Sequence, residues 1–419
     1  MKKRLCALLL IGCMALSILM VPAAATGLLI SPKPAESGML LPRVRTYEGQ
    51  LTDASDAWCT DAIQTVYETG LMEGKTTSRF DYTSPLTEAQ SVVIAARVYA
   101  RLIGKEIPAP AEGERWYQPS YDLLSSLSKS VSPEIARLLV TESFIEDAHH
   151  QDAWRDNFIG SLLVALHGAG TELPVLNQLE TRPPDLAADS PELLLYRAGI
   201  LNGTDQYGSF DATGTLTRGQ AAAILARLAD PAQRLTFTLT SFDLCTDALK
   251  VPPETVLFTV DNHALTAREA AYTMALGITT HSRLWDSSMN WSETYMLNTL
   301  CEYYALETMA NERNTELSPE TEALLDTQAL RLAGTGGASR EGHLFWQRYN
   351  ALYSAVKRSY DGTDNAHGVS EPFDQALKQY AAEISLEPTA TYQALDLAAF
   401  RQVLLNSGFY FMTMEPLYR

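Results

Sequence analysis

The sequence predicts a mainly α-helical protein with three helix-loop-helix repeats, followed by a second helical domain that contains a short β element. Three observations support this fold class. A helix-loop-helix motif occurs twice in the first half, long amphipathic patterns fill the second half, and the composition is globular, with 46% hydrophobic and 20% charged residues. A length of 419 residues also favours two or three domains over one.

The first 25 residues have the layout of a secretory signal peptide. A basic start at residues 2–4 precedes an apolar run that continues as far as Val21, and residues 23–25 are alanines suited to cleavage. We therefore expect an exported protein, exclude residues 1–25 from the fold, and treat residues 26–48 as a linker.

A lipoprotein anchor at Cys13 is the alternative to cleavage near Ala25. Residues 10–13 (LIGC) look like a lipoprotein cleavage box, but the apolar run continues past Cys13, as it does when the whole stretch is one signal-peptide core. No other segment contains the 18 or more consecutive apolar residues of a membrane span. We expect a mature chain without a membrane span.

The net charge of −18 argues against a nucleic-acid-binding protein, because phosphates are bound by clustered lysine and arginine. Loss of the leader makes the chain more acidic still. Three cysteines remain after the leader, at positions 59, 245 and 301. They are far apart and odd in number, so we expect no disulfide framework and no cysteine metal site.

One motif occurs twice in the first half of the chain, and both copies have the same order of parts. In each copy ten residues separate a phenylalanine from a later glutamine, Phe80 from Gln90 and Phe210 from Gln220. Such self-similarity predicts a repeat architecture. The parts are GLMEG (70–74), FD (80–81) and LTEAQ (86–90) in one copy, and GILNG (199–203), FD (210–211) and LTRGQ (216–220) in the other.

Each copy predicts a helix that ends at a glycine, a compact loop, and a second helix that begins at a threonine. Thr87 with Gln90, and Thr217 with Gln220, form capping boxes, in which a hydroxyl and an amide satisfy backbone donors at the helix start. The apolar faces of the second helices are expected to pack together as a small core. These helices are expected over Val92–Leu102 and Ala221–Leu228.

This spacing resembles that of the S-layer-homology (SLH) family, whose helix-opening element is commonly Thr-Arg-Ala-Glu. The resemblance is closest over Leu193–Leu228, within a third copy placed at residues 181–232, and the first copy spans residues 49–108. A degenerate middle copy is placed at residues 113–170, where residues 154–158 (WRDNF) stand at the helix-opening position. Three such repeats form a pseudo-threefold bundle with binding grooves between neighbours, and the resemblance implies this arrangement here.

Arg218 lies in the first turn of its helix, where the helix dipole disfavours a cation, and a residue that breaks a local rule is a candidate for ligand contact. With Thr217, itself a candidate glycan-binding residue, and the backbone N–H groups that follow it, this guanidinium is expected to form a carboxylate or phosphate site. In the resembled family this arginine contacts an acidic, often pyruvylated, secondary cell-wall polymer, which the resemblance implies as the partner here. An ion pair with a carboxylate such as Asp211, or a solvated Arg218, is the alternative.

Three further residues are candidates for the same glycan ligand. Arg155 has the position of Arg218 in the middle copy, whereas Glu88 has it in the first copy and would repel an anion. Trp58 and Trp116 lie near the starts of the first helices of their copies, where an aromatic face could stack on a sugar ring. Packing of both tryptophans in the repeat core is the alternative.

The composition changes after the third repeat, and residues 236–419 are predicted to form a mainly helical domain. Glu254–Val260 is predicted as a strand, Asp261-Asn262 as a turn, and Thr266 with Glu269 as a capping box that opens a helix. Long amphipathic patterns follow, separated by loops with Gly or Pro. They predict helices over Ser292–Asn311, Pro319–Leu332, His343–Tyr360 and Glu371–Ile384.

Three segments of this domain, VLFTVDNHALTAREAAY (256–272), residues 295–313 and ELSPE (316–320), together resemble the helical chaperone module of SurA- and PrsA-type extracytoplasmic foldases. Residues 373–386 resemble the helix and strand that close that module after a parvulin insert. A parvulin domain needs about 100 residues, and only 361–369 are available here. The resemblance therefore implies a module without an isomerase, which binds exported or unfolded polypeptide on apolar surface. A plain spacer domain is the alternative.

The sequence contains no H-E-x-x-H, G-x-S-x-G or P-loop motif, so we assign no catalytic residue and expect neither enzyme activity nor a cofactor. Our main hypothesis is that this is a cell-surface protein. Its repeats anchor it to an anionic wall polymer, while the helical domain faces exported polypeptides. One alternative is a foldase-like chaperone or degenerate isomerase, in which the repeats serve only to fix its location. The other is a purely structural or protein-interaction bundle.

Overall fold

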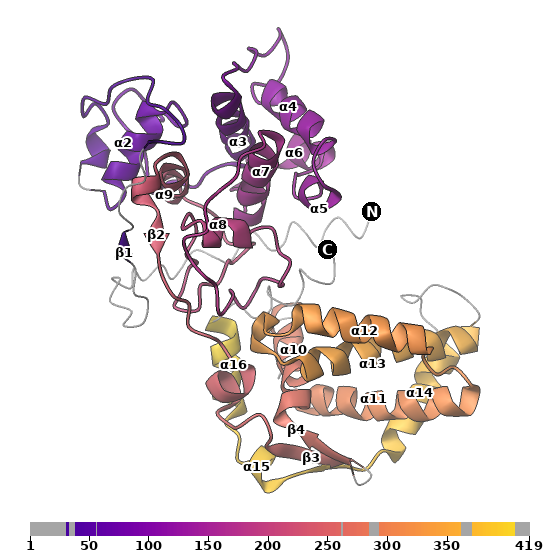
Figure 1. Cartoon of the computed structure of the whole chain (residues 1–419). Coiled ribbons are helices and arrows are strands. Elements are labelled where there is room, and N and C mark those ends of the chain that lie inside the picture. Colours follow the sequence, from indigo (N-terminus) through magenta and orange to yellow (C-terminus); the bar gives the residue numbers. More distant parts are fainter. Residues whose placement is uncertain are drawn as a thin grey trace.

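The computed structural model describes residues 31–32, 38–55, 57–260, 263–284, 293–361 and 371–406. The predicted leader, part of the linker and the predicted turn at Asp261-Asn262 lie outside the described residues. The described chain is mainly helical, as the sequence predicts. Figure 1 shows two groups of helices that follow each other along the chain.

The first group, which we name the N-terminal bundle, buries one hydrophobic cluster that extends from Leu41 to Leu239. Helix α3 packs on α4 and α7, α4 packs on α7, and α2 packs on α9 (Figure 1). Two short strands pair antiparallel. The elements of the bundle are β1 (Ser31–Pro32), α2 (Thr60–Glu68), α3 (Glu88–Ile103), α4 (Gln118–Ser128), α5 (Pro133–Ala136), α6 (Glu142–Ala148), α7 (Arg155–Gly168), α8 (Leu193–Arg197), α9 (Arg218–Ala229) and β2 (Leu235–Thr236).

Both capping boxes predicted from the sequence are confirmed. The hydroxyl groups of Thr87 and Thr217 accept hydrogen bonds from the backbone N–H groups of Gln90 and Gln220, at 3.4 and 3.2 Å, and each glutamine amide oxygen accepts the threonine N–H. Helices α3 and α9 therefore begin directly after the threonines and are longer than their apolar patterns indicated.

The three segments that precede α3, α7 and α9 are joined in a ring of backbone hydrogen bonds. The N–H of Leu86 donates to the carbonyl of Leu216 at 2.8 Å, and the N–H of Leu216 donates to the carbonyl of Ala153 at 3.3 Å. The N–H of Ala153 donates to the carbonyl of Leu86 at 2.7 Å and closes the ring. The starts of three helices that are distant in sequence are thus held at one place.

The first two backbone N–H groups of these three helices also have partners in the loop of another segment. Such groups have no acceptor within their own helix, so the loop carbonyls satisfy them and fix the direction of each helix. The pairs are Glu88 and Ala89 with Gln151 and His149, Arg155 and Asp156 with Gly214 and Ala212, and Arg218 and Gly219 with Ser84 and Tyr82.

The second group, which we name the C-terminal helical domain, buries a separate cluster that extends from Phe242 to Leu404. Its three strands form an antiparallel sheet in the order β4-β3-β5. Thr266 donates its N–H and its hydroxyl to the Glu269 carboxylate, at 2.9 and 2.7 Å, where the sequence predicts a capping box. The strands are β3 (Val256–Val260), β4 (His263–Thr266) and β5 (Leu386–Pro388).

The helices of this domain match the amphipathic patterns closely. The pattern predicted over 319–332 is the helix α12 without any shift, whereas α13 begins before and ends after its predicted bounds. Helix α13 packs on α10, α11 and α12, and α11 packs on α14. The helices are α10 (Ala267–Leu284), α11 (Glu293–Arg313), α12 (Pro319–Leu332), α13 (Arg340–Asp361), α14 (Glu371–Glu383), α15 (Ala390–Gln393) and α16 (Leu397–Asn406).

The two groups contact each other where α12 ends. The Arg182 guanidinium of the N-terminal bundle donates to the carbonyls of Leu332 and Ala333, and Arg331 forms an ion pair with Asp189 at 2.9 Å. Carbonyl groups at a helix end lack partners within the helix, so Arg182 caps α12 from the other group.

Candidate functional site

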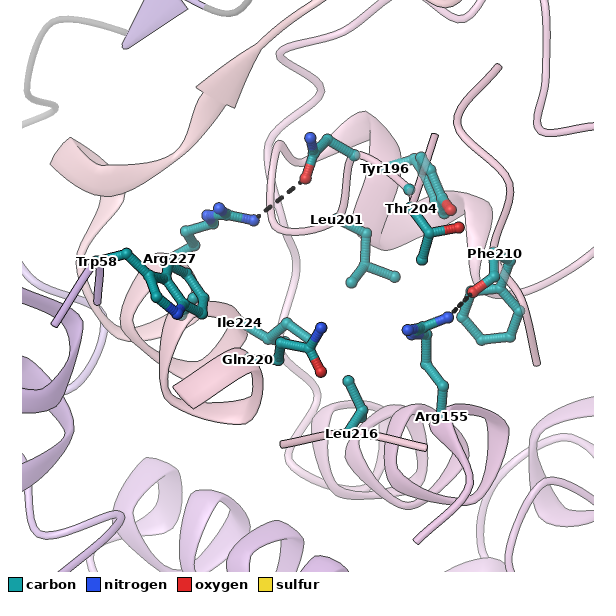
Figure 2. Close-up of a pocket in the computed structure, with 13 residues that line it drawn as sticks. Trp58, Arg155, Tyr196, Leu201, Thr204, Phe210, Leu216, Gln220, Ile224 and Arg227 are labelled. Atoms are coloured by element: carbon teal, nitrogen blue, oxygen red, sulfur yellow. Dashed lines mark hydrogen bonds between the residues drawn. The ribbon is translucent and has the colours of Figure 1, made fainter. Parts of the chain in front are cut away.

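A groove of about 550 Å³ lies beside α9, and residues from three separate parts of the N-terminal bundle line it (Figure 2). Trp58 comes from the segment before α2, Arg155 from the first turn of α7, and the remaining residues from α8, α9 and the chain between them. We name this cavity the Arg155 groove. Its lining residues are Trp58, Arg155, Tyr196, Leu201, Asn202, Gly203, Thr204, Phe210, Leu216, Gln220, Ala223, Ile224 and Arg227.

In Figure 2 Arg155 extends into the groove from the helix at the lower edge of the view, with its guanidinium against the backbone of Phe210. Its Nη1 donates to the carbonyls of Phe210 and Asp211, at 2.6 and 2.8 Å, and lies 3.0 Å from the Asp211 carboxylate. Among the described residues no hydrogen bond is made by Nε or Nη2. The side chain is therefore anchored through one nitrogen. Only 9% of it is exposed, nearly as little as for Arg218, but unlike Arg218 it lines the groove, where its remaining donors can meet a planar anion.

Arg227 supplies a second cation to the same groove from the last turns of α9. Its Nη1 donates to the carbonyl of Ile200 at 3.2 Å and to the amide oxygen of Asn202 at 3.4 Å. Burial lowers the pKa of Arg227, and no ion pair with it occurs within the described part of the chain. A guanidinium stays charged in proteins, so Arg227 is a half-buried positive charge that an anion would stabilise.

Trp58 adds an aromatic side chain to the wall of the Arg155 groove. It is 60% exposed, so the alternative in which it packs in the repeat core is wrong. Figure 2 shows the indole next to Arg227, with Arg155 on the opposite side of the groove. The groove thus combines a stacking surface with anion-binding donors.

The structure places Arg218 differently from the site that the sequence predicts. Its side chain is only 6% exposed and lies 4.8 Å from the centre of the Phe80 ring, and its Nε donates to the Phe80 carbonyl at 3.0 Å. Its Nη2 donates to the carbonyl of Glu73 at 2.5 Å, and burial lowers its pKa. Arg218 is not among the residues that line the Arg155 groove.

The expected use of the backbone donors behind Thr217 is also wrong. The N–H groups of Arg218 and Gly219 donate to the carbonyls of Ser84 and Tyr82, both at 2.9 Å, and the Thr217 hydroxyl accepts the N–H of Gln220. The first turn of α9 therefore presents no free amides to an anion. The predicted alternative, an ion pair with Asp211, belongs to Arg155 instead.

Trp116 is exposed, but it does not line the Arg155 groove. It is 53% exposed just before α4, and its ring meets that of Tyr117 edge-on at 5.8 Å. The alternative in which Trp116 packs in the core is therefore wrong. Trp116 also shares no site with Arg155 in the Arg155 groove.

Glu88 has the position in α3 that arginines have in α7 and α9, and it is 1% exposed. Its Oε1 accepts the N–H of Trp154 at 3.1 Å and the amide of Asn157 at 2.8 Å. Burial raises the pKa of Glu88 to about 7, and Asp156 adds to the increase. A second cavity of about 430 Å³ lies nearby, lined by residues that include Trp154, Asp156 and Asn157.

Arg227, Asn202 and Gln220 were missed as site residues by sequence reasoning. A signal for Arg227 was present, because Arg97 and Arg227 both stand ten residues after the capping threonines of the two clear repeat copies. A recurring arginine on an otherwise apolar helix is a candidate for a role that is common to both copies.

Within the described residues no three His, Cys, Asp or Glu side chains gather as a metal site, and no described helix is long and apolar enough to cross a bilayer. Comparison with protein-family models, with curated proteins and with solved structures found no match to this chain.

Proposed function

We propose that the chain is an exported cell-surface protein whose N-terminal bundle binds an acidic cell-wall glycan in the Arg155 groove. The observation that carries the proposal is that two arginines and an exposed tryptophan line one cavity of about 550 Å³. A volume of this size suits a small number of sugar rings. The Asp211 carboxylate neutralises part of Arg155, and no described carboxylate pairs with Arg227.

The arrangement of the bundle supports a relationship to the SLH family. The three helix starts are equivalent in the ring of hydrogen bonds, because Leu86, Ala153 and Leu216 each donate to one member and accept from the other. The first two N–H groups of each helix form a second cycle, which runs from the first copy to the middle, from the middle to the third and from the third to the first. We therefore propose that residues 49–108, 113–170 and 181–232 form three SLH-like repeats around a pseudo-threefold axis, with the groove between neighbours.

The proposal keeps the predicted ligand contact at Arg155, adds Arg227 and omits Arg218. Arg218 and Arg155 have corresponding places in α9 and α7, but Arg218 has its donors occupied by carbonyls of the Glu73 and Phe80 loop. Its role is therefore to hold two repeats together. Arg155 retains unused donors that face the groove (Figure 2).

The purified chain should sediment with wall sacculi that carry a pyruvylated secondary polymer, and should not sediment after acid extraction of that polymer. Loss of one charge-assisted hydrogen bond costs about 1.5 to 3 kcal/mol, which corresponds to a weakening of about 10- to 100-fold. We expect Arg227→Ala to weaken binding by about this amount, and Arg155→Ala by at least as much. Trp58→Ala should weaken it less.

The matched control is Arg79→Ala, which removes the same charge from an exposed position in the first repeat. It should bind as the unmodified chain does. Thermal unfolding of each variant separates loss of binding from loss of fold. Equal retention on extracted sacculi, or equal effects of Arg79→Ala and Arg227→Ala, would count against glycan recognition in the groove.

A second candidate function, binding of exported polypeptides, has support in the C-terminal helical domain. Strand β5 pairs with β3 although some 130 residues separate them, so the late strand closes the domain as in the resembled chaperone module. Leu324 and Leu330 of α12 are 56% and 63% exposed. The chain should suppress aggregation of an unfolded client, and replacement of both leucines by serine should reduce this effect.

A further inference from the structure

The two clear repeat copies share a set of hydrogen bonds at corresponding positions. Arg97 donates its Nη1 to the carbonyl of Leu71 at 3.3 Å, and Arg227 donates its Nη1 to the carbonyl of Ile200 at 3.2 Å. Both carbonyls belong to the first residue after the glycine that ends the preceding helix, at Gly70 and Gly199. Arg97 is therefore the counterpart of Arg227.

A second pair of residues also corresponds. The N–H of Arg45 donates to the carbonyl of Glu68 and its side chain donates to the carbonyl of Tyr67, at 3.3 and 2.5 Å. Asn177 makes the same two contacts with Arg197 and Tyr196, both at 3.0 Å. Asn177 is thus the neutral counterpart of Arg45.

The copies differ in charge at the residue before the second glycine of the motif. This residue is Glu73 in the first copy and Asn202 in the third. The Glu73 carboxylate forms an ion pair with Arg45 at 2.8 Å, and Arg45 and Arg97 together hold its pKa below the usual range. Asn202 offers only a neutral amide oxygen to Arg227, at 3.4 Å.

We infer that Glu73 acts as a built-in anion that closes the first copy to acidic ligands, and that the neutral Asn202 leaves the Arg155 groove open to them. This inference rests on the proposed function and names the residue that selects which copy binds. The first copy has Arg97 and Arg218 at the positions that Arg227 and Arg155 have in the third copy, although Arg218 already donates Nε and Nη2 to loop carbonyls. The first copy also contains the Glu73 carboxylate and its partner Arg45, where the third copy has the neutral Asn202 and Asn177.

Electrostatics favours this assignment because a ligand anion must replace or approach a carboxylate of the same sign. Glu73 is tied to Arg45, whose guanidinium also stacks on the Tyr67 ring at 3.9 Å and donates to the carbonyl of Met72. An incoming acidic sugar would have to displace an anion whose local concentration is far higher. No described carboxylate competes for Arg227.

The test introduces the carboxylate into the open groove and uses a methyl glycoside of a pyruvylated N-acetylhexosamine as probe, with binding followed by titration calorimetry. Asn202→Glu should weaken binding at least tenfold, whereas Asn202→Gln, of the same length and neutral, should stay within about twofold, since one nearby ion pair is worth about a factor of ten. The unmodified chain should bind one equivalent of probe. Glu73→Gln should raise this number toward two.

The outcomes separate this inference from the proposed function. If the unmodified chain binds neither probe nor sacculi, both fail, because Asn202 cannot keep open a groove that takes no ligand. If Arg227→Ala abolishes binding while Asn202→Glu binds as the unmodified chain does, only the inference fails. Equal weakening by Asn202→Glu and Asn202→Gln would also overturn it, because size rather than charge would then decide. The thermal unfolding midpoint of each variant identifies any that fails to fold.

Discussion

Ionisation of the Glu88 carboxyl group should destabilise the N-terminal bundle, and Glu88→Gln should remove this effect. The group is buried where α3 meets the start of α7, and burial raises its pKa from 4.5 to about 7. Hydrogen bonds from Asn157 and Trp154 oppose this increase, and the charge of Asp156 adds to it. Oε2 is buried without a hydrogen-bond partner.

The direction in which stability changes with pH follows from the linkage between protonation and folding. Because the pKa of Glu88 is higher in the folded chain, the stabilising contribution of the protonated group is complete below pH 4.5 and is lost as the pH rises through about 7. One pKa unit corresponds to about 1.4 kcal/mol, so the loss between the two limits is about 3 kcal/mol. Glutamine retains an oxygen for Trp154 and Asn157 and does not ionise.

Urea unfolding of both proteins between pH 5 and pH 8, followed by tryptophan fluorescence, measures the difference directly. Glu88→Gln should be close to the unmodified chain near pH 5 and more stable than it by about 2 to 3 kcal/mol at pH 8. Other titrating groups are common to both proteins and cancel in the difference. Glu106→Gln, at an exposed position, is the control and should show no such trend. A difference that stays constant across this range would refute the argument from burial.

Three further changes test the scaffold, each by urea or thermal unfolding. Gly199→Ala should destabilise the chain far more than Gly104→Ala, although both glycines have positive φ. An added Cβ at Gly199 would lie 2.3 Å from the carbonyl oxygen of Leu235, whereas nothing lies within 4 Å of one at Gly104. We expect Gly104→Ala to lower the free energy of unfolding by about 1 to 2 kcal/mol. Similar effects would contradict the close approach. Asp185→Ala should cost about 2 to 4 kcal/mol, because its buried carboxylate accepts two backbone N–H groups, at 2.8 and 2.6 Å; a loss below 1 kcal/mol would be inconsistent with this. Arg182→Ala should separate the unfolding transitions of the two groups in calorimetry, since it caps α12 from the N-terminal bundle; unchanged cooperativity would show that other contacts join them.

Much of the secondary structure could be predicted because its signals are local. The capping boxes at Thr87 and Thr217 have all their atoms within one helical turn, and the pattern over Pro319–Leu332 begins at a proline after the capping Ser318. Such signals depend little on the remainder of the chain. They predicted α12 at its observed bounds.

The candidate site was harder to predict because its contacts join distant segments. Arg218 donates to the carbonyls of Phe80 and Glu73, 138 and 145 residues away, and no local pattern indicates that backbone rather than ligand takes its donors. The helix-dipole argument identified an unusual arginine correctly but not its partner. Arg155, in the copy with the weakest motif, retains the free donors.

In the proposed arrangement of three repeats, the ring of hydrogen bonds accounts for a middle copy that has its place in the bundle without the sequence motif. All the ring contacts are made by backbone atoms, which any residue other than proline supplies, so the cap can be Thr87, Trp154 or Thr217. The next side chain is correspondingly free to be a glutamate or an arginine. A sequence motif in such a scaffold therefore indicates the course of the backbone more reliably than the ligand. The ring does not depend on the side chains of Glu73, Glu88 and Asn202, so changes of specificity should occur at these positions without loss of fold.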